Sequence, residues 1–383
     1  MRKMAARKTV PKETTTVDTE KAKAFDEAIA GIAKKYKSDT GRIIGKLSDK
    51  PIEIERFSSG SVVLDSIIGG GFPRGRIIEL YGPESSGKTS FALTAAGNVQ
   101  KKGGTAVLVD MENSFDPVYA KRLGVDTKNL AVSQPDYAEQ ALQIVADLVM
   151  SGAVDLIVVD SVASLVPKKE VDGEMDDQTI GLQARLMSHA LRKLTPLANK
   201  TQTTIIFINQ TRQSIGMFAT ETVPGGNALK FYASLRVRIS KSSKPVLADG
   251  TPIGTNVFLT CKKNKVSVPF MEGQTLLTFK HGVDKALELL ECGLRYGIIE
   301  REGNTRYIEK ATGEIITTKS RAEAISEIRK NPEMMARLAD ALTQRLNEIA
   351  FGDEVDEKED APAATEDSFV IDDSGDTEVT LDE

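Results

Sequence analysis

Cysteine is scarce in this chain, and long apolar runs are missing from it. The 383 residues include only two cysteines, Cys261 and Cys292, which form neither a CxxC motif nor a metal-ligand spacing. So few cysteines indicate a protein of a reducing, cytoplasmic compartment. No apolar run reaches the length of a membrane-spanning helix. Residues 1–20 also lack the apolar stretch of a secretion signal.

Charge is unevenly distributed along the chain. The net charge is −5, but residues 353–383 contain 14 acidic residues and a single basic one, Lys358. This tail therefore carries −13 and the first 352 residues carry +8. A basic body with an acidic tail indicates a polyanionic partner for which the tail competes. The alternative, which composition alone favours slightly, is a disordered tail that keeps the protein in solution.

Buried parallel strands are expected in the central part of the chain. Four short runs rich in Val and Ile lie at 77–81, 106–109, 156–159 and 204–208. They do not alternate with polar residues, which is typical of strands covered on both faces. Helical patterns separate several of them, and the clearest is predicted to begin at Asp136, with Glu139 completing a capping box, and to end at Gly152. This alternation predicts an α/β domain with a parallel sheet.

The regions on either side of this core have a different character. An amphipathic helix is predicted at 21–37, packed either on its own domain or on a neighbouring subunit. Near the other end we expect a helix at 284–293, a hairpin at 305–318, and helices capped at Ser320 and Asn331. The expected domains are a disordered 1–20, a helix and linker at 21–49, the core at 50–284, a small α+β domain at 285–351 and an acidic disordered tail at 352–383.

A phosphate-binding loop is the most specific motif in the sequence. Residues 82–89 read GPESSGKT, directly after an apolar run and before a predicted helix. Its glycines allow backbone N–H groups to converge on phosphate oxygens, Lys88 supplies a cation and Thr89 offers a hydroxyl to Mg²⁺. The helix that follows directs its positive end at the nucleotide. A glycine-rich turn without a ligand is the less common explanation. We therefore predict a site for ATP and Mg²⁺ made by Gly82, Pro83, Glu84, Ser85, Ser86, Gly87, Lys88, Thr89 and Ser90.

Carboxylates with suitable positions follow two of the core strands. The run at 156–159 ends in Asp160, which places this side chain at the carboxyl edge of the sheet, where it can hold the metal. Hydrolysis also needs a group that orients or deprotonates water. Asp110 and Glu112 are both candidates, because they follow the run at 106–109 and spacing alone does not choose between them. Either could instead cap a helix or face solvent.

Two segments without clear periodicity, 167–181 and 211–226, follow core strands on the nucleotide side of the sheet. Segments of this length usually bind something or are disordered. The helix predicted between them has an apolar side of Leu182, Leu186 and Ala190 and a polar face of Arg185, Ser188 and Arg192. Such a face suits phosphate contacts, although an ordinary solvated face explains it equally well.

Two lysines, Lys263 and Lys265, stand two residues apart after the apolar run 257–259. Residues at this spacing on a strand point to the same side, so the two ammonium groups are expected to converge on one target. They could be solvated edge charges, which is the commoner case, or they could reach a phosphate.

Five blocks of the sequence resemble the signature blocks of the bacterial RecA recombinase family. They read GPESSGKTS, LIVVDSVASLVPK, IIFINQTR, GGNALKFYAS and KKNKVSVPF, and they occur in the expected order. The likeness runs from about residue 26 to about 293, and more loosely to 352. It implies a RecA-type P-loop ATPase core, whose twisted, mainly parallel sheet is flanked by helices, with an N-terminal docking helix and a small C-terminal α+β domain.

The resemblance also implies roles for residues of the nucleotide site. Glu112, rather than Asp110, would activate water. Asp116 and Tyr119 would contact the adenine, and Gln210 would sense the γ-phosphate and couple it to the segment that begins at Thr211.

Further roles concern DNA and the neighbouring subunit. Lys263 and Lys265 would reach the neighbour's ATP, and Phe231 would insert into the adjacent protomer. The two long segments would contact DNA, and the residues along its backbone would be Arg185, Ser188, Arg192, Arg212, Gly225, Gly226 and Asn227.

The function implied is that of a DNA-dependent ATPase. It would form helical filaments on single-stranded DNA, pair it with double-stranded DNA and exchange strands in recombination, repair and the SOS response. Recombination mediators and a cleavable repressor are implied as further partners, and the acidic tail would restrain access to DNA. Two alternatives remain open from the residues: a ring-forming helicase motor on a related core, and a DNA-coating or mediator protein that uses ATP only as a clamp.

Some positions depart from the family pattern. The 211–226 segment is slightly short, and residues 113–115 differ from the usual sequence after Glu112. Phe258 and Thr260 stand where basic residues are common, which moves a second DNA site to Lys241, Lys244 or Lys262. Such divergence suits a phage- or plasmid-borne relative.

Overall fold

The computed structural model describes residues 19–36, 44–46, 54–174, 181–213, 221–241 and 251–351. The chain divides into two units, Met1–Glu53 and Ile54–Glu383. In the first unit, helix α1 (Thr19–Lys35) begins and ends two residues before the expected bounds. Its Phe25 side chain is 58% exposed. The second unit contains the sheet, the phosphate-binding loop and the C-terminal elements.

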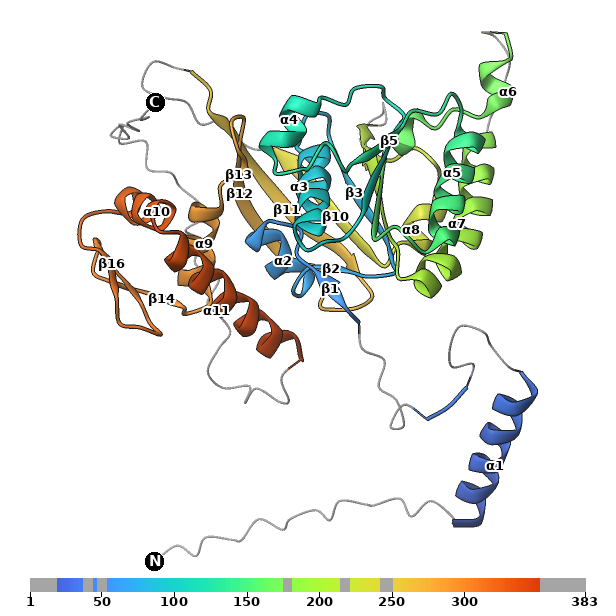
Figure 1. Cartoon of the computed structure of the whole chain (residues 1–383), viewed down its shortest axis with the longest axis horizontal. Helices are drawn as coiled ribbons and strands as arrows, with labels where there is room; N and C mark the ends of the chain where they lie inside the picture. Colours follow the sequence, from blue (N-terminus) through green and yellow to red (C-terminus); the bar gives the residue numbers. More distant parts are fainter. Residues whose placement is uncertain are drawn as a thin grey trace, which may run out of the picture. The chain divides into compact units, whose positions relative to one another are not determined.

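The second unit is built around a nine-stranded sheet with the order β13-β12-β11-β10-β3-β7-β6-β4-β5 (Figure 1). The strands from β10 to β5 in this order run parallel, and β11, β12 and β13 extend the sheet, each antiparallel to the strand before it. Their bounds are β3 (Ile77–Gly82), β4 (Ala106–Asp110), β5 (Ala131–Ser133), β6 (Leu156–Asp160), β7 (Thr204–Gln210), β10 (Leu235–Lys241), β11 (Gly254–Asn264), β12 (Glu272–Thr278) and β13 (Gly282–Val283). All four apolar runs form the expected strands, so the predicted mainly parallel α/β fold is confirmed.

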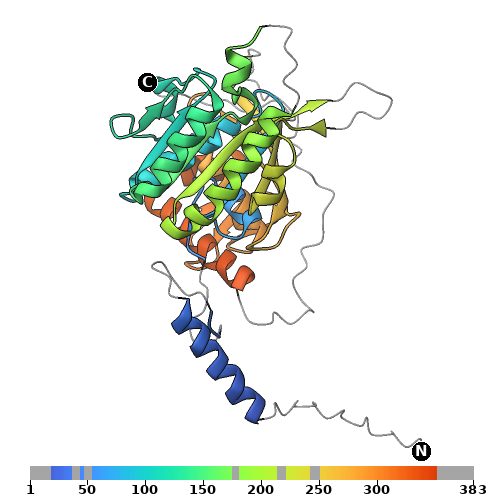
Figure 2. The ribbon, with the colours of Figure 1, turned by 90° about the vertical axis from the view of Figure 1, so that its right-hand side faces the viewer.

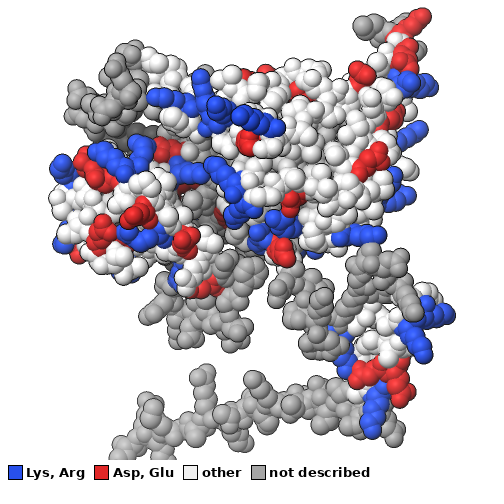
Figure 3. Space-filling model, viewed as in Figure 1, with Lys and Arg blue, Asp and Glu red and all other residues white. Residues whose placement is uncertain are grey.

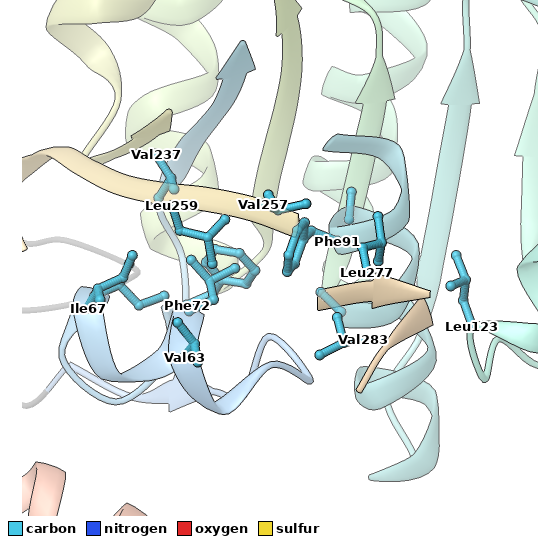
Figure 4. Packing of buried hydrophobic residues seen from close by; sticks show 14 of the residues in the cluster. Val63, Ile67, Phe72, Phe91, Leu123, Val237, Val257, Leu259, Leu277 and Val283 are labelled. Carbon is cyan, nitrogen blue, oxygen red and sulfur yellow. The ribbon is translucent and has the colours of Figure 1, made fainter. Parts of the chain in front are cut away.

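Helices cover both faces of this sheet, because alternate strand residues point to opposite sides. Leu156 and Val158 belong to one apolar cluster and Ile157 and Val159 to the other. The first face carries α2 (Val62–Ile68), α3 (Lys88–Lys101) and α4 (Pro117–Arg122), and Figure 4 shows how its side chains pack. The second carries α5 (Ala138–Ser151), α7 (Leu182–Thr201) and α8 (Ala228–Tyr232). Figure 2 shows α5 and α7 lying side by side.

The start of α5 differs from the prediction. The helix begins at Ala138, and no side chain caps it. The Ala138 N–H instead donates to the carbonyl of Val166 at 2.8 Å, and the Glu139 carboxylate accepts from the N–H of Lys168 at 2.8 Å. The predicted capping box at Asp136 is therefore wrong, because the Glu139 carboxylate binds Lys168 and the Asp136 N–H donates to Oε1 of Gln140 at 2.9 Å. The helix ends at Gly152, with φ 66°, as expected.

The buried side of α7 also differs from the prediction. The expected apolar residues Leu186 and Ala190 are only half-buried, as is Leu182. The fully buried stripe consists of Met187, Leu191, Leu194 and Ala198. The helix is thus rotated so that a stripe at spacings of three and four residues meets the sheet and α5. Arg185 and Arg192 remain exposed, as their predicted polar face requires.

Both long segments contain short elements in the part that the structure describes. The segment at 167–181 includes α6 (Lys168–Val171), and residues 175–180 lie outside the described residues. Between β6 and this segment is a 3₁₀ turn, η1 (Val162–Ser164). In the 211–226 segment, β8 (Arg212–Gln213) pairs with β9 (Glu221–Thr222). Residues 214–220 are outside the described residues.

The C-terminal elements follow the predicted order with one addition. Helix α9 (Lys285–Arg295) begins after Asp284, α10 (Arg321–Lys330) after Ser320 and α11 (Pro332–Phe351) after Asn331. In each case a side-chain oxygen of the preceding residue accepts a backbone N–H of the first turn. The expected hairpin is β15 (Arg306–Glu309) and β16 (Ile315–Thr317). A third strand, β14 (Ile299–Glu302), was not predicted, since only Ile299 in it is buried.

Polar contacts join α9 to the remainder of its unit. Glu288 is buried, and its carboxylate accepts from the Ser61 hydroxyl at 2.6 Å and from the Val62 N–H at 2.7 Å, at the start of α2. One turn further along α9, Glu291 pairs with Arg321 of α10. On the face seen in Figure 3, acidic and basic side chains are interspersed over these C-terminal helices. A short sheet of β1 (Arg56–Phe57) and β2 (Phe72–Pro73) flanks α2. Among the described residues, no helix has the length and apolar character needed to cross a bilayer.

Candidate nucleotide and DNA site

The phosphate-binding loop connects the end of β3 to the start of α3. A Cβ on Gly82 would lie 1.9 Å from the carbonyl oxygen of Ile239 on the adjacent strand β10. A Cβ on Gly87, whose φ is 92°, would lie 2.6 Å from Leu277 Cδ2. Both positions therefore require glycine, because the loop is packed directly against the sheet. This tight turn directs the first N–H groups of α3 toward the carboxyl edge of the sheet.

Lys88 is buried at the first position of α3. Its Nζ donates to the carbonyls of Pro83 at 2.7 Å and Gly82 at 3.2 Å. Burial lowers the pKa of this ammonium group, and the nearby carboxylates of Asp160 and Glu112 oppose that shift. The Ser86 hydroxyl is buried in the same loop and has no hydrogen-bond partner among the described residues. The loop thus holds a buried cation and a hydroxyl without a partner among the described residues, and both groups can bind a phosphate.

Thr89 and Asp160 form the pair of oxygen ligands expected for the metal. The Thr89 hydroxyl donates to the Asp160 carboxylate at 2.6 Å, so the two side chains meet at the ends of α3 and β6. Burial raises the pKa of Asp160 to about 6, and the charges of Glu112 and Asp110 add to this shift. A hydroxyl and a carboxylate at this edge, beside a phosphate loop, fit the hard-oxygen preference of Mg²⁺.

Asp110 and Glu112, between which the sequence spacing did not choose, have different surroundings. Asp110 is buried and accepts the backbone N–H groups of Glu112, Ser114 and Phe115 at 3.2, 3.4 and 3.2 Å. It also accepts from the Gln134 amide at 3.1 Å. Asp110 therefore holds the chain after β4 in place. Glu112 is exposed and is free of this structural task.

Glu112 contacts the ends of two other strands. Its Oε1 accepts from the hydroxyl of Ser161, which follows β6, at 2.6 Å. The same oxygen accepts from the amide of Gln210, the last residue of β7, at 2.8 Å. Lys88, Asp160, Glu112 and Gln210 thus come from four adjacent strand ends at one sheet edge. This arrangement supports Glu112 over Asp110 as the group that faces water.

Asp116 and Tyr119 both lie at α4, beside the phosphate loop. Asp116 caps the helix, with its Oδ1 accepting from the Val118 N–H at 2.8 Å. The Tyr119 hydroxyl lies 2.9 Å from the Ser90 hydroxyl, so its ring is tied to α3. Their predicted contact with adenine stays a prediction.

A buried polar network beside the phosphate loop was missed by sequence reasoning. Glu79 in β3 is fully buried, and its carboxylate accepts from Arg236 Nε at 2.5 Å and from Asn209 Nδ2 at 3.1 Å. The same Asn209 amide donates to the carbonyl of Pro224 at 3.2 Å. The available signal was a charged residue inside the apolar run 77–81, since a buried carboxylate requires partners.

The 211–226 segment is anchored at both ends. The Thr211 N–H donates to the carbonyl of Gly82 at 3.1 Å, so the segment starts on the phosphate loop itself. At its other end, Gly225 and Gly226 have φ of 82° and 71°. A Cβ on them would lie 2.8 Å from Val162 Cγ1 and from Ala184 Cβ, respectively. These glycines therefore bring the segment against η1 and the first turn of α7.

The side chains predicted to contact DNA lie on α7, in β8 and just before α8. Arg185 and Arg192 are exposed on α7 and Ser188 is half-buried. Arg212 in β8 and Asn227, which precedes α8, are also exposed. Of the proposed second-site lysines, Lys241 and Lys262 are exposed on β10 and β11, and Lys244 lies outside the described residues.

Lys263 and Lys265 converge, as their spacing predicts. Lys263 Nζ donates to the carbonyls of Lys230 at 2.6 Å and Phe231 at 3.0 Å, and Lys265 Nζ donates to the Phe231 carbonyl at 3.0 Å. Burial, followed by the charges of Lys265 and Arg236, lowers the pKa of Lys263 to about 8. The Phe231 side chain is 73% exposed. Two cations and a projecting aromatic ring therefore share one surface at the end of α8.

Comparison with known proteins places this geometry in a family. The model of the RecA N-terminal domain family matches residues 23–284. Protein RecA of Wolinella succinogenes is 47% identical over 352 residues, which cover 90% of this chain and 98% of the relative. Protein RecA of Thermus thermophilus is 42% identical over 346 residues, 90% and 100% of the two chains. Protein RecA of Nitratiruptor sp. is 51% identical over 294 residues, 75% and 84% of the two. This chain therefore belongs to the RecA family and is a DNA-dependent ATPase of homologous recombination, DNA strand exchange and DNA repair.

Proposed function

We propose that ATP and Mg²⁺ bind in the 82–90 loop between two copies of the chain, and that this nucleotide sets how tightly a helical filament of copies holds single-stranded DNA. The observation that carries the proposal is the cluster of Lys88, Asp160, Glu112 and Gln210 at one sheet edge, with Thr211 bonded to the phosphate loop. The phosphate loop and the first residue of the DNA-contacting segment are thus joined directly by a backbone hydrogen bond.

Within the nucleotide site, each residue has a distinct task. Lys88 exchanges its bonds to loop carbonyls for phosphate oxygens, and Ser86 supplies its unused hydroxyl. Thr89 and Asp160 hold Mg²⁺, which when bound offsets phosphate charge. Glu112, oriented by Ser161 and Gln210, holds the attacking water and receives its proton. Asp116 and Tyr119 contact the adenine.

The neighbouring copy completes this site. Lys263 and Lys265 of one protomer lie against the neighbour's ATP, where two cations stabilise the charge that develops in phosphoryl transfer. Phe231 inserts into the same neighbour. In support of this role, its side chain is 73% exposed at the end of α8. Helix α1 packs on a neighbour through the apolar face that includes Phe25. A symmetric repeat of such head-to-tail contacts builds a filament.

Single-stranded DNA lies along α7 and the 211–226 segment. Arg185, Arg192 and Arg212 neutralise phosphates, while Gly225 and Gly226 permit close approach of the backbone. Ser188 and Asn227 add hydrogen bonds. Lys241 and Lys262 attract the duplex, and the acidic segment 352–383 limits its access. Mediator proteins and a cleavable repressor bind the filament, which operates in the cytoplasm.

The test is ATP hydrolysis measured with and without single-stranded DNA, together with electron microscopy of the same samples. Wild-type protein is expected to hydrolyse ATP faster with DNA and to form helical filaments, whereas Lys88→Ala loses turnover. A protein that stays monomeric with ATP and DNA both in excess contradicts the proposal. Closed rings alone would assign the chain to a translocating motor instead.

A further inference from the structure

One glutamine joins the two segments that we assign to DNA. Gln183 is half-buried in the first turn of α7. Its Nε2 donates to the carbonyls of Val162 at 2.8 Å and Leu165 at 3.1 Å, just before the 167–181 segment. Its Oε1 accepts from the N–H of Gly225 at 3.1 Å, near the end of the 211–226 segment. Both donor hydrogens of this amide are therefore used on the backbone that leads into the 167–181 segment, and one acceptor site is used on the backbone of the 211–226 segment.

The first end of this bridge leads to the catalytic carboxylate. Val162 begins η1 and directly follows Ser161. The Ser161 hydroxyl donates to Glu112 at 2.6 Å. A shift of Glu112 on this side is therefore transmitted to a backbone turn whose carbonyls Gln183 holds.

The second end leads to the same carboxylate by another route. Gly225 follows Pro224, whose carbonyl accepts from the Asn209 amide at 3.2 Å. Asn209 is adjacent to Gln210, which donates to Glu112 at 2.8 Å. The two routes form a ring that starts at Glu112 and closes at Gln183. Both strand ends that contact Glu112 are thus tied together by one side chain.

Packing makes this junction tight. A Cβ on Gly225 would lie only 2.8 Å from Val162 Cγ1, so the 211–226 segment approaches η1, which leads into the 167–181 segment, as closely as a glycine allows. Such close-packed contacts have discrete arrangements and do not deform continuously. A rearrangement of one segment therefore forces a rearrangement of the other while Gln183 spans them.

We propose that Gln183 is a positioning residue that links the two DNA-contacting segments into one unit, so that DNA bound to either segment acts on Glu112 through both Ser161 and Gln210. This inference rests on the proposed roles of these segments. It assigns to Gln183 no contact with DNA, ATP or water. Loss of the bridge uncouples the segments, so DNA remains bound but stimulates hydrolysis less.

The experiment compares two replacements of the amide. Gln183→Met keeps the length of the side chain and removes all three hydrogen bonds. Gln183→Glu keeps the acceptor for Gly225 but places a carboxylate against the carbonyls of Val162 and Leu165. Gln143→Met is the matched control, because Gln143 is exposed on α5 and bonds only locally, to Asp147.

For each variant, kcat and KM for ATP are measured with and without single-stranded DNA, along with thermal unfolding. We expect the DNA-stimulated increase in kcat to fall about 5- to 150-fold in both Gln183 variants, the range of typical coupling between sites. DNA-independent kcat and KM should stay within about twofold of wild type, because the groups that bind and hydrolyse ATP are unchanged. Stimulation within about twofold of wild type in both variants would overturn the proposal. If Gln183→Met does not fold, Gln183→Glu decides.

A double-mutant cycle with Gln210→Ala tests whether the ring acts as one route. The combined loss of stimulation in Gln183→Met/Gln210→Ala should be smaller than the product of the single losses, since both changes open the same ring. Losses that multiply fully would show independent effects and contradict the ring. Full DNA stimulation in Gln210→Ala alone would instead count against the proposed function, while the Gln183 variants still report on the bridge.

Discussion

Gln210 donates a hydrogen bond from Nε2 to Oε1 of Glu112 across 2.8 Å, which joins the end of β7 to the chain that follows β4. Strand β6 lies between these two strands, and its next residue, Ser161, donates to the same oxygen. Glu112 is therefore held in one orientation by two neighbours before any nucleotide is considered. Since Gln210 directly precedes the 211–226 segment, this hydrogen bond joins Glu112 to the base of that segment.

Replacement of Glu112 by Gln should separate binding from hydrolysis. The amide keeps the size of the side chain but cannot accept a proton, so we expect turnover of ATP to fall by about 10²- to 10⁴-fold. Binding of a fluorescent ATP analogue should stay close to wild type. Asp110→Asn is the contrasting variant: it weakens the carboxylate that holds the chain after β4, and lower stability is expected there. Normal hydrolysis by Glu112→Gln would show that another group activates water.

Loss of one partner of the buried pair Glu79 and Arg236 should lower stability more than loss of both. The two side chains are 1% and 14% exposed, so removal of one leaves the other charge buried without its partner. Glu79→Leu is expected to lower the free energy of unfolding by about 3–5 kcal/mol. The double variant Glu79→Leu/Arg236→Met, which buries no charge, should recover most of this loss. Urea unfolding measures both, and equal losses in the single and double variants would mean that packing, not charge, accounts for the effect.

Glu288 should make stability depend on pH in the neutral range. Burial raises the pKa of its carboxyl to about 7, above the ordinary value of 4.5, and the nearby Asp65 adds to the shift. The folded protein thus binds this proton more tightly than the unfolded chain. The resulting stabilisation is fully present below pH 4.5 and is lost as pH rises through about 7.

Glu288→Gln removes this titration. Wild-type stability, measured by urea unfolding across this range, should fall with rising pH by on the order of 2–3 kcal/mol more than that of Glu288→Gln. Parallel pH profiles for the two proteins would place the titration elsewhere. The contacts of Glu288 with Ser61 and Val62 locate its effect at the junction of α9 and α2.

The arginines of α7 should determine how DNA binding depends on salt. Arg185→Ala and Arg192→Ala each remove an exposed cation, so each should weaken DNA binding. For single-stranded DNA, each should also reduce the magnitude of the slope of log K against log salt concentration by about 0.7. Lys200→Ala, at the far end of the same helix, is the control that should leave the slope unchanged. Fluorescence anisotropy with labelled single-stranded DNA at several salt concentrations measures this. If both arginine variants keep the wild-type slope, as Lys200→Ala is expected to do, the DNA does not lie along this face of α7.

The sequence was sufficient for features that depend on local pattern. The runs at 77–81 and 156–159 form buried strands because nothing but a covered sheet suits such uninterrupted apolar residues. The phosphate loop follows from the glycine spacing, since Gly82 and Gly87 have no room for a side chain. Asp160 meets Thr89 because parallel strands end at a common edge.

Features that depend on distant partners could not be predicted in this way. The capping box of α5 failed because the Glu139 carboxylate accepts from the N–H of Lys168, 29 residues later, and the Asp136 N–H donates to Gln140 instead. Asp110 and Glu112 remained equivalent until the backbone N–H groups around Asp110 were placed. The Gln183 bridge has no local signal, because its three partners belong to segments on either side of α7 in the sequence.

The ammonium groups of Lys263 and Lys265 already have oxygen partners, the carbonyls that close α8. These carbonyls accept hydrogen bonds but carry no net charge, so the positive charge of the two ammonium groups is not neutralised by them. If a second copy brings its nucleotide to this surface, as proposed above, phosphate oxygens would replace the carbonyls and supply the negative charge that the carbonyls lack. On that proposal, subunits would associate and separate by exchanging one set of oxygen partners for another at a surface that the single protomer already presents.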